Sequence, residues 1–295
     1  MCEPVIAAVD RESGRAASFG NEALALIMRS PDEYSPLRPV SGGIVRDASL
    51  FEGFLRFMLR RAGLRLLHPG IVICLPPFCA GRDTRAVSML VRNAVAGRVG
   101  FIEPARAAAS GVENAGIVIN IDSAAVTVAV SAPGGGSFSL PLGGDAFDLA
   151  LIRHLRIEYG LTAGLEEAGR IRRAAGCVFP FETLRTVEIH GRCSNSGLPK
   201  VVSVSSEELC MALRPVCIEL IEAVGLFAAR LAAPHREFVK EKGITLTGGD
   251  IPHGLDSLFA EKTGLTAVIA AEPHFAAVRG ALQKTAERFI IKDNV

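Results

Sequence analysis

The chain has 295 residues, of which 49% are hydrophobic and 21% charged, and its formal net charge is +1. This length and composition predict one large or two ordinary globular domains with a sizeable core, and they exclude a largely disordered chain. The near-zero net charge gives no electrostatic reason to expect nucleic acid as a partner. No apolar run approaches the ~20 residues that span a bilayer, and no signal peptide opens the chain, which predicts a cytoplasmic protein.

Cysteine and histidine patterns give no sign of a metal centre. The seven cysteines form no C-x-x-C pair, and the six histidines are scattered singly. An odd number of cysteines without a secretory signal fits a reducing cytoplasm. Since no cysteine and histidine have ligand spacing, no metal is expected. No G-x-S-x-G motif or Ser/His/Asp spacing is present either, so no catalytic residue is assigned.

In the first half of the chain, apolar periodicity alternates between strand and helix. The run GIVICLPP is typical of a buried strand that two prolines end, because proline cannot join a ladder. The expected elements are a helix over 51–61, a strand over 70–77, a helix over 81–96, a strand over 99–104, a short helix near 106–115 and a hairpin region over 117–142.

Helical signals dominate the start of the second half, over 145–176, where Asp145 is a candidate N-cap. Ser205 or Ser206 followed by Glu208 resembles a capped helix start. The other expected elements are a strand-like patch over 186–209, a long helix over 207–233, a strand over 243–250, a helix over 251–264, a strand over 266–273 and a closing helix from 274. The alternation predicts an α/β chain with some parallel sheet.

Three turns are candidates for a nucleotide site. The hairpin IVINIDSAAVTVAV (117–130) has the outline of strands around a phosphate loop, yet its turn holds an acid and no glycine. LGGDAFD (142–148) and LTGGD (246–250) each place a glycine pair before a helix, where backbone approaches a phosphate or ring closely. Such turns also occur where they serve the fold alone and bind no ligand, so a nucleotide site and a purely structural turn both stay open. Walker A and G-x-G-x-x-G motifs are absent.

The order of these pieces resembles the bacterial actin MreB family over essentially the whole chain. EPVIAAVDRESGRAASFGNEA (3–23), SPLRPVSGGIVRDASLFEGFLRFML (35–59) and GITLTGGD (243–250) follow the family's order and near-family spacing. The resemblance implies an actin-like fold, shared with sugar kinases and large heat-shock chaperones, with two α/β domains around a central nucleotide cleft. It implies a first domain over 1–113, a second over 114–273 with a smaller subdomain at about 151–224, and a closing helix (274–291) that packs onto the first domain.

Departures from the family pattern fall on the phosphate side of that cleft. Asn120 stands where the family has an aspartate near magnesium; Asp122, Ser123 and Ala124 replace three glycines, and Ala125 replaces a threonine. Side chains then crowd the backbone amides that would face phosphate oxygens. Asp122 also adds a negative charge, and a like-charge pair at about 4 Å costs roughly 1 kcal/mol in water and about 4 at a protein-surface dielectric.

Two further departures point the same way, while the purine side is partly kept. The chain begins at MCEP, so the family's first hairpin is expected to be missing. Pro104 takes the place of the water-activating glutamate, with Glu103 as the alternative if the register slips by one residue; proline can neither accept a proton nor orient water. Residual nucleotide contacts expected from family positions are Asp122, Ser123, Ala124, Gly169, Arg172, Gly248, Gly249, Asp250 and Ile251.

A loop at 63–70, GLRLLHPG, carries Leu64, Leu66 and Leu67. In the family, two large apolar residues at this place dip into the inner face of the cytoplasmic membrane. Clustered exposed leucines favour such a contact, and the alternative is a loop folded against its own helix.

These features favour an MreB-like protein linked to cell shape that has lost ATPase activity and binds ATP and magnesium weakly at most. It is expected to co-assemble with itself or with an intact MreB-type protein, in the cytoplasm or peripherally at the inner membrane face. Two alternatives stay open: an ATP-dependent filament-forming protein whose start codon is misassigned, and a non-functional remnant. The sequence does not decide whether filaments form.

Overall fold

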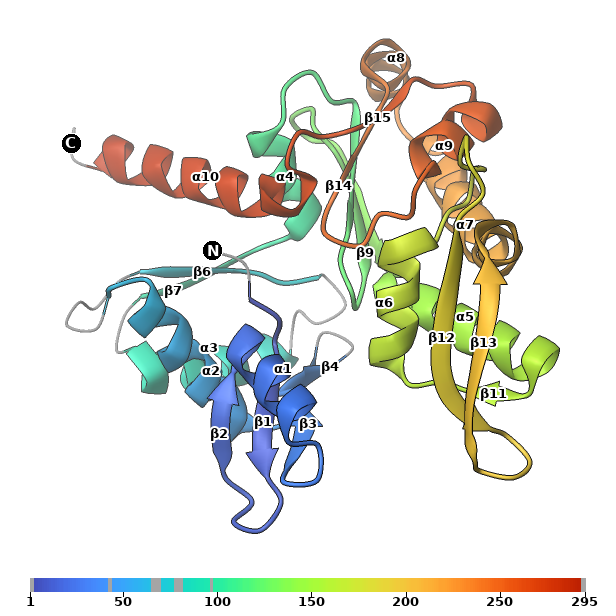
Figure 1. Cartoon of the computed structure of the whole chain (residues 1–295). Helices are drawn as coiled ribbons and strands as arrows, with labels where there is room; N and C mark the ends of the chain where they lie inside the picture. Colours follow the sequence, from blue (N-terminus) through green and yellow to red (C-terminus); the bar gives the residue numbers. More distant parts are fainter. Residues whose placement is uncertain (1–2, 42–43, 65–69, 77–81, 96–97, 293–295) are drawn as a thin grey trace. The chain divides into compact units, whose positions relative to one another are not determined.

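A computed structural model describes residues 3–41, 44–64, 70–76, 82–95 and 98–292 (Figure 1). The chain divides into two compact units, Met1–Ile102 and Glu103–Val295. Each unit contains helices and strands, which confirms the predicted α/β class. The sequence-based domain boundary near residue 113 stays a prediction.

The first unit contains a three-stranded antiparallel sheet in the order β2-β1-β3. The central strand has small buried side chains that allow both of its faces to be covered. Ala8 packs with Ala23 of the following helix on one face, and Val9 packs with Leu50 on the other. The elements are β1 (Ala7–Asp10), β2 (Ala16–Phe19), α1 (Gly20–Arg29) and β3 (Tyr34–Leu37).

Two helices and a parallel strand pair form the rest of this unit. Asp47 caps the first helix by accepting a hydrogen bond from the Leu50 amide at 2.9 Å. Val87 and Val91 of the second helix are buried in a cluster with the parallel strands. The elements are β4 (Val40–Ser41), β5 (Ile44–Val45), α2 (Ala48–Arg61), β6 (Ile71–Cys74), α3 (Arg82–Val95) and β7 (Val99–Ile102).

The second unit is built on a five-stranded mixed sheet in the order β10-β9-β8-β14-β15. The first three strands are antiparallel, as predicted for the hairpin region, and β8, β14 and β15 run parallel. Every residue of β8, β9 and β14 is buried. The strands are β8 (Ile117–Ile121), β9 (Val126–Val130), β10 (Ser137–Leu140), β14 (Ile244–Thr247) and β15 (Ala267–Ile269).

Helices cover both faces of this sheet (Figure 1). On one face, Val118 of β8 packs with Ala108 and Ala276 of two helices. Those helices, α4 (Pro104–Gly111) and α10 (Ala276–Lys292), approach so closely that a Cβ on Gly280 would lie 1.7 Å from the Ala107 carbonyl oxygen. The other face carries the main core, which includes Ile117, Ile119 and Ile121.

The main core also receives helices that follow the hairpin. They are α5 (Gly144–Tyr159), α6 (Leu165–Ala175), α7 (Ser206–Ala229), α8 (Ala233–Lys242) and α9 (Leu255–Thr263); a short 3₁₀ turn, η2 (Pro273–Phe275), precedes α10. A smaller antiparallel sheet in the order β11-β12-β13 lies within the range predicted for a subdomain. Its strands are β11 (Leu161–Thr162), β12 (Thr186–Cys193) and β13 (Pro199–Ser205).

The helix ends confirm one sequence prediction and correct two others. Ser205 and Glu208 form a complete capping box at α7, as predicted. Asp145 is not an N-cap, because α5 begins at Gly144, with Gly143 at the cap and Asp145 inside the first turn. The long helix predicted over 207–233 is α7, which begins at Ser206 and ends at Ala229, four residues before the predicted end. The separate helix α8, which begins at Ala233, has no counterpart among the predicted elements.

Candidate functional site

Three turns meet at the carboxyl ends of β8 and β14, all within the second unit. The β8–β9 turn accepts hydrogen bonds from the start of α5: the Gly144 amide donates to the Asp122 carbonyl at 3.0 Å, and the Asp145 amide to the Ser123 carbonyl at 2.8 Å. The Asp250 amide, after β14, donates to the Ile121 carbonyl at 3.2 Å. The amides at the start of α5, where an anion would otherwise bind, are therefore occupied by the hairpin.

Close backbone contact explains two of the glycines. A Cβ on Gly143 would lie 2.1 Å from the Asp122 carbonyl oxygen, and one on Gly248 would lie 2.1 Å from the Ile121 carbonyl oxygen. Gly248 also has φ +100°, a conformation that other residues rarely adopt. Gly249 has open space around it. The fold alone thus requires Gly143 and Gly248, and Gly249 has no such requirement.

A buried arginine joins these turns. Arg172 of α6 donates through Nε to Asp148 Oδ1 at 2.7 Å and through Nη2 to Asp250 Oδ1 at 2.6 Å. The side chains are 4% exposed for Arg172, 7% for Asp148 and 11% for Asp250, so water screens these ion pairs little. The other Asp250 oxygen accepts the Ser123 hydroxyl at 2.7 Å. Both oxygens of Asp250 are therefore engaged.

The pKa values of Asp148 and Arg172 are both raised, for opposite reasons. Burial raises the pKa of Asp148, although the Arg172 hydrogen bond and charge oppose this. For Arg172, burial would lower the pKa, but the Asp148 and Asp250 hydrogen bonds and charges outweigh it and the pKa is raised. The short N–H···O distances are those of an ionised pair, and a guanidinium stays charged in proteins.

Asp122 has its own set of partners. Its carboxylate accepts from Asn120 Nδ2 at 2.6 Å and from the Gly249 backbone amide. Asn120 is fixed in turn by the Thr247 hydroxyl, which donates to its Oδ1 at 3.1 Å. Burial raises the pKa of Asp122 to about 6; the Asn120 and Gly249 bonds oppose the shift, and the Asp250 charge adds to it. The residue as a whole keeps exposed surface.

The site holds both acidic and basic side chains. The carboxylates of Asp148 and Asp250 contact the Arg172 guanidinium, and that of Asp122 lies in the neighbouring β8–β9 turn. A second guanidinium is near, because Arg173 Nη1 and Asp148 Oδ2 would each lie 3.1 Å from a Cβ on Gly169. A phosphate needs unoccupied donors and positive charge. Ser123, Arg172 and the Gly249 amide each already donate to an aspartate of the chain, which any phosphate bound by them would have to replace.

All nine residues predicted from family positions lie at or beside this network. Gly169 of α6 adjoins Asp148, because a Cβ there would lie 3.1 Å from Asp148 Oδ2. Ala124 lies in the β8–β9 turn, and Ile251 directly follows Asp250. Nucleotide contact by these residues stays a prediction.

Sequence reasoning missed Asp148, the second carboxylate on Arg172. A signal was present: Asp148 occupies the same face of α5 as the buried Leu151 and Leu155, three and seven residues on. An acid on the apolar stripe of a helix calls for a buried cation partner. Gly143 and Gly144 stood in a turn that the sequence had singled out, but their contact with the hairpin could not be read from it.

The other predicted positions contribute less. Glu103 is the N-cap residue of α4 and pairs with Arg106 at 2.9 Å, and Pro104 is the first residue of that helix. Leu64 is half-buried, and its amide donates to the Leu59 carbonyl at 2.9 Å. Leu66 and Leu67 lie outside the described residues.

The described residues contain neither a metal-site cluster nor a membrane-spanning helix. Over these ranges, no group of three or more His, Cys, Asp or Glu side chains has the arrangement of a metal site. None of the helices in the same ranges combines the length and apolar character that crossing a bilayer requires.

Sequence comparison relates the chain to one family over nearly its whole length. The family model described as MreB/Mbl protein matches residues 1–292. The cell shape-determining protein Mbl of Bacillus cereus is 28% identical over 289 residues, which cover 94% of this chain and 86% of that protein. The cell shape-determining protein MreB of Escherichia coli is 28% identical over 294 residues, covering 94% and 85%.

Solved structures with the same fold include a nucleotide complex and a filament. The crystal structure of MreB5 of Spiroplasma citri bound to ADP has a TM-score of 0.87 at 21% identity, covering 99% of this chain and 92% of that one. The MamK double helical filament has a TM-score of 0.81 at 17% identity, covering 96% and 91%. These likenesses confirm the predicted actin-like fold.

Proposed function

The chain belongs to the MreB/Mbl family, and on that premise we propose that it serves cell shape as an actin-like assembly module. In this proposal the chain binds a triphosphate weakly and does not hydrolyse it. Relatives named as cell shape-determining proteins support the cellular role. The MamK filament supports assembly as the mode of action, with the chain itself or an intact MreB-type protein as the partner.

One observation carries the claim of weak triphosphate binding: the Ser123 hydroxyl, the Arg172 guanidinium and the Gly249 amide are engaged by the chain's own aspartates. Arg172 is held between two carboxylates, and the Gly249 amide is held by Asp122. A phosphate oxygen would have to displace them and lie near three negative charges. A like-charge pair at about 4 Å costs ~4 kcal/mol at a surface dielectric, and every ~1.4 kcal/mol weakens binding tenfold. The MreB5 structures with ADP and AMPPNP are the contrasting case.

Loss of hydrolysis follows from the residues near the start of α4. Pro104 offers no group that could activate water, and the Glu103 carboxylate is engaged by Arg106. A general base must reach the proton that it removes and must be ready to accept it. Glu103 in an ion pair is poorly suited to that role.

Titration calorimetry with ATP plus magnesium, compared with adenosine, tests the proposal. We expect ATP to bind no more tightly than adenosine, because the triphosphate tail adds repulsion rather than contacts. The matched variant Asp122→Gly/Ser123→Gly/Ala124→Gly restores three glycines and removes one charge, so it should bind ATP at least tenfold more tightly than the wild type. Micromolar ATP binding by the wild type, with steady phosphate release, would overturn the proposal.

Co-assembly is tested separately from nucleotide binding. The full chain is centrifuged alone and with an intact MreB/Mbl-type protein, with and without ATP, and the pellets are imaged by electron microscopy. We expect the chain to enter filaments without needing ATP of its own. A monodisperse chain that never pellets under any of these conditions contradicts the assembly role.

The proposal includes contact with the inner membrane face. It depends on Leu64, Leu66 and Leu67, whose apolar side chains would enter the headgroup region. Flotation with anionic vesicles, comparing the wild type with Leu66→Glu/Leu67→Glu, tests it. Equal flotation of the two proteins would show that these leucines do not bind the membrane.

A further inference from the structure

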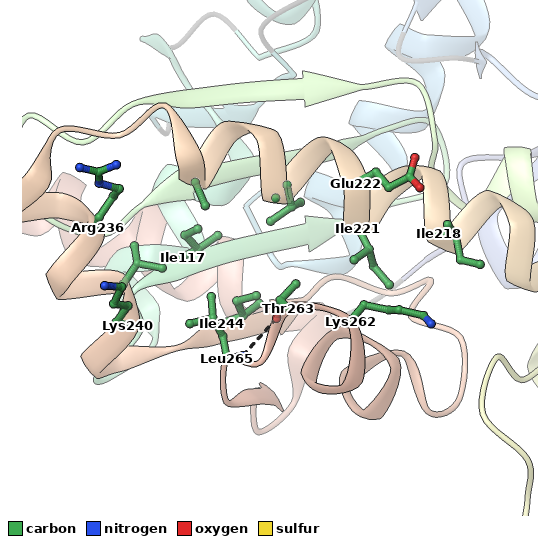
Figure 2. A pocket seen from close by; sticks show the side chains of 14 residues that line it. Ile117, Ile218, Ile221, Glu222, Arg236, Lys240, Ile244, Lys262, Thr263 and Leu265 are labelled. Atoms are coloured by element: carbon green, nitrogen blue, oxygen red, sulfur yellow. Dashed lines mark hydrogen bonds between the residues drawn. The ribbon is translucent and has the colours of Figure 1, made fainter.

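A hollow lies in the same unit, at the amino ends of the central strands. The pocket has a volume of about 620 Å³ and is lined by α7, α8, the end of α9 with the segment that follows it, and the first residues of β8 and β14 (Figure 2). Pockets that hold small molecules typically measure ~300–1,000 Å³. Since β8 has five residues at ~3.3 Å each, its two ends lie about 13 Å apart. The pocket is therefore distinct from the Arg172 network.

The floor of the pocket is aliphatic. Ile117 and Ile244, the first residues of the two parallel strands, are buried side by side, because they are direct register partners. Side chains of α7, of α8 and of the segment between α9 and β15 complete the apolar lining: Ile218, Ile221, Val224, Val239 and Leu265. No aromatic ring and no buried charge lines it among these residues, so the floor offers dispersion contacts and apolar burial to a ligand.

Positive charge gathers at one end of the rim. Arg236 and Lys240 are one turn apart on α8, and Figure 2 shows both at the same end of the pocket. Lys240 pairs with Glu237 at 3.0 Å, but both side chains are largely exposed, and such pairs are weak. Among the described residues, Arg236 makes no ion pair. Glu222 and Lys262 lie toward the other end.

A glycine in the wall keeps the pocket open. Gly225 lies in the interior of α7, where glycine destabilises a helix by roughly 0.5–1 kcal/mol relative to alanine. No heavy atom lies within 4 Å of a Cβ built there, so packing does not require the missing side chain. A larger residue at this position would project into the hollow that it lines.

We propose that this pocket binds an amphipathic anion with a single alkyl chain, of the fatty-acid type. The chain lies over the Ile117–Ile244 floor, and the carboxylate is held by Arg236 and Lys240. A guanidinium and an ammonium on one helix face suit a compact anionic head, and the apolar floor suits a hydrocarbon. This site is independent of the proposed function at the phosphate side.

The test is titration calorimetry of the full chain with decanoate and dodecanoate, kept below micelle-forming concentrations. We expect saturable one-site binding that tightens roughly fourfold per added methylene, or about tenfold or more between the two acids, as for burial of apolar chain. Dodecyltrimethylammonium, with the same tail and a cationic head, should bind at least tenfold more weakly. No saturable dodecanoate binding would overturn the proposal.

Variants assign the binding to the pocket. Gly225→Phe fills the hollow and should abolish dodecanoate binding while circular dichroism stays unchanged. Arg236→Ala/Lys240→Ala should weaken it at least tenfold, whereas the matched surface pair Arg153→Ala/Arg156→Ala should leave it unaltered. If Gly225→Phe does not fold, the Arg236/Lys240 pair decides. Binding that persists in the pocket variants contradicts the proposal.

Vesicles separate a free amphiphile from a membrane lipid. The full chain is floated with neutral vesicles and with vesicles that contain an anionic phospholipid. We expect Gly225→Phe to float like the wild type, because the pocket takes a free single chain. The proposal would be overturned if the protein did not bind free dodecanoate and its flotation depended on Arg236 and Lys240. These two cations would then bind a bilayer surface.

Discussion

The two ends of strands β8 and β14 are filled in opposite ways. Beyond their carboxyl ends, three turns and a buried arginine with two carboxylates occupy the space. At their amino ends, an aliphatic hollow stays open beside a helix glycine. Ligands of open α/β sheets usually bind at the carboxyl ends. In this chain, hydrogen bonds among its own turns and side chains occupy that end.

Removal of Arg172 is the strongest way to break this contrast. Arg172→Ala leaves Asp148 and Asp250 buried without their ion-pair partner, and breaking a buried pair in this way costs about 3–5 kcal/mol of unfolding free energy. Denaturant unfolding measures the loss. The control is Arg170→Ala on the same helix, whose side chain is 48% exposed in its ion pair with Glu167, and this pair is expected to contribute at most ~1 kcal/mol. Equal losses of unfolding free energy in the two variants would mean that water screens the Arg172 ion pairs.

The glycine pair after β14 sharpens the contrast within one turn. Gly248→Ala forces a Cβ toward the Ile121 carbonyl at φ +100°, and we expect it to lower the unfolding free energy by roughly 2–3 kcal/mol. Gly249→Ala meets open space and should change it by no more than about 0.5 kcal/mol. Thermal unfolding of the two variants side by side checks the difference. A tolerated Gly248→Ala would show that the turn can move.

Asp122 predicts a pH dependence with a definite sign. Its folded-state pKa is raised from 3.8 to about 6, so the folded chain binds this proton more tightly than the unfolded chain does. The stability that this proton provides is full below pH ~4 and is lost as the pH rises through about 6. After solvent screening we expect about 1 kcal/mol. Asp122→Asn should remove this slope from unfolding curves recorded between pH 4 and 7; an unchanged slope refutes the assignment.

The smallest effect is expected at the open end. Gly225→Ala should raise the unfolding free energy by roughly 0.5–1 kcal/mol, because it improves helix propensity without a clash. Denaturant midpoints measure this gain. A loss of stability would show that α7 needs a glycine there, and the pocket would then be a by-product of packing.

The sequence predicted most elements and few of the contacts between them. The hairpin at 117–130, with two apolar runs around a polar turn, and the Ser205–Glu208 capping box could be predicted, because each is a local pattern. The pairing of Arg172 with Asp148 and Asp250 spans 24 and 78 residues, and only the fold brings them together. Family positions identified the members of the site, but not that they satisfy one another.

The errors have the same physical origin. Asp145 has the residue type of a cap, yet the hairpin carbonyls already accept from the first amides of α5, so a side-chain cap was not needed. The pocket could not be predicted at all, since it depends on Gly225 lying opposite two strand ends that are distant in sequence. An empty volume leaves no trace in an amino-acid pattern.

The contact between α4 and α10 has a mechanical consequence. Gly111 and Gly280 let the two helix backbones touch, and the Ala105 amide at the head of α4 is tied to the Thr127 hydroxyl of β9 at 3.0 Å. The chain enters the second unit at Glu103, directly before this clamp. A pull applied through the connecting segment would therefore reach the α4–α10 contact and the Ala105–Thr127 hydrogen bond first. A subunit that carries tension within a polymer would profit from such an anchorage.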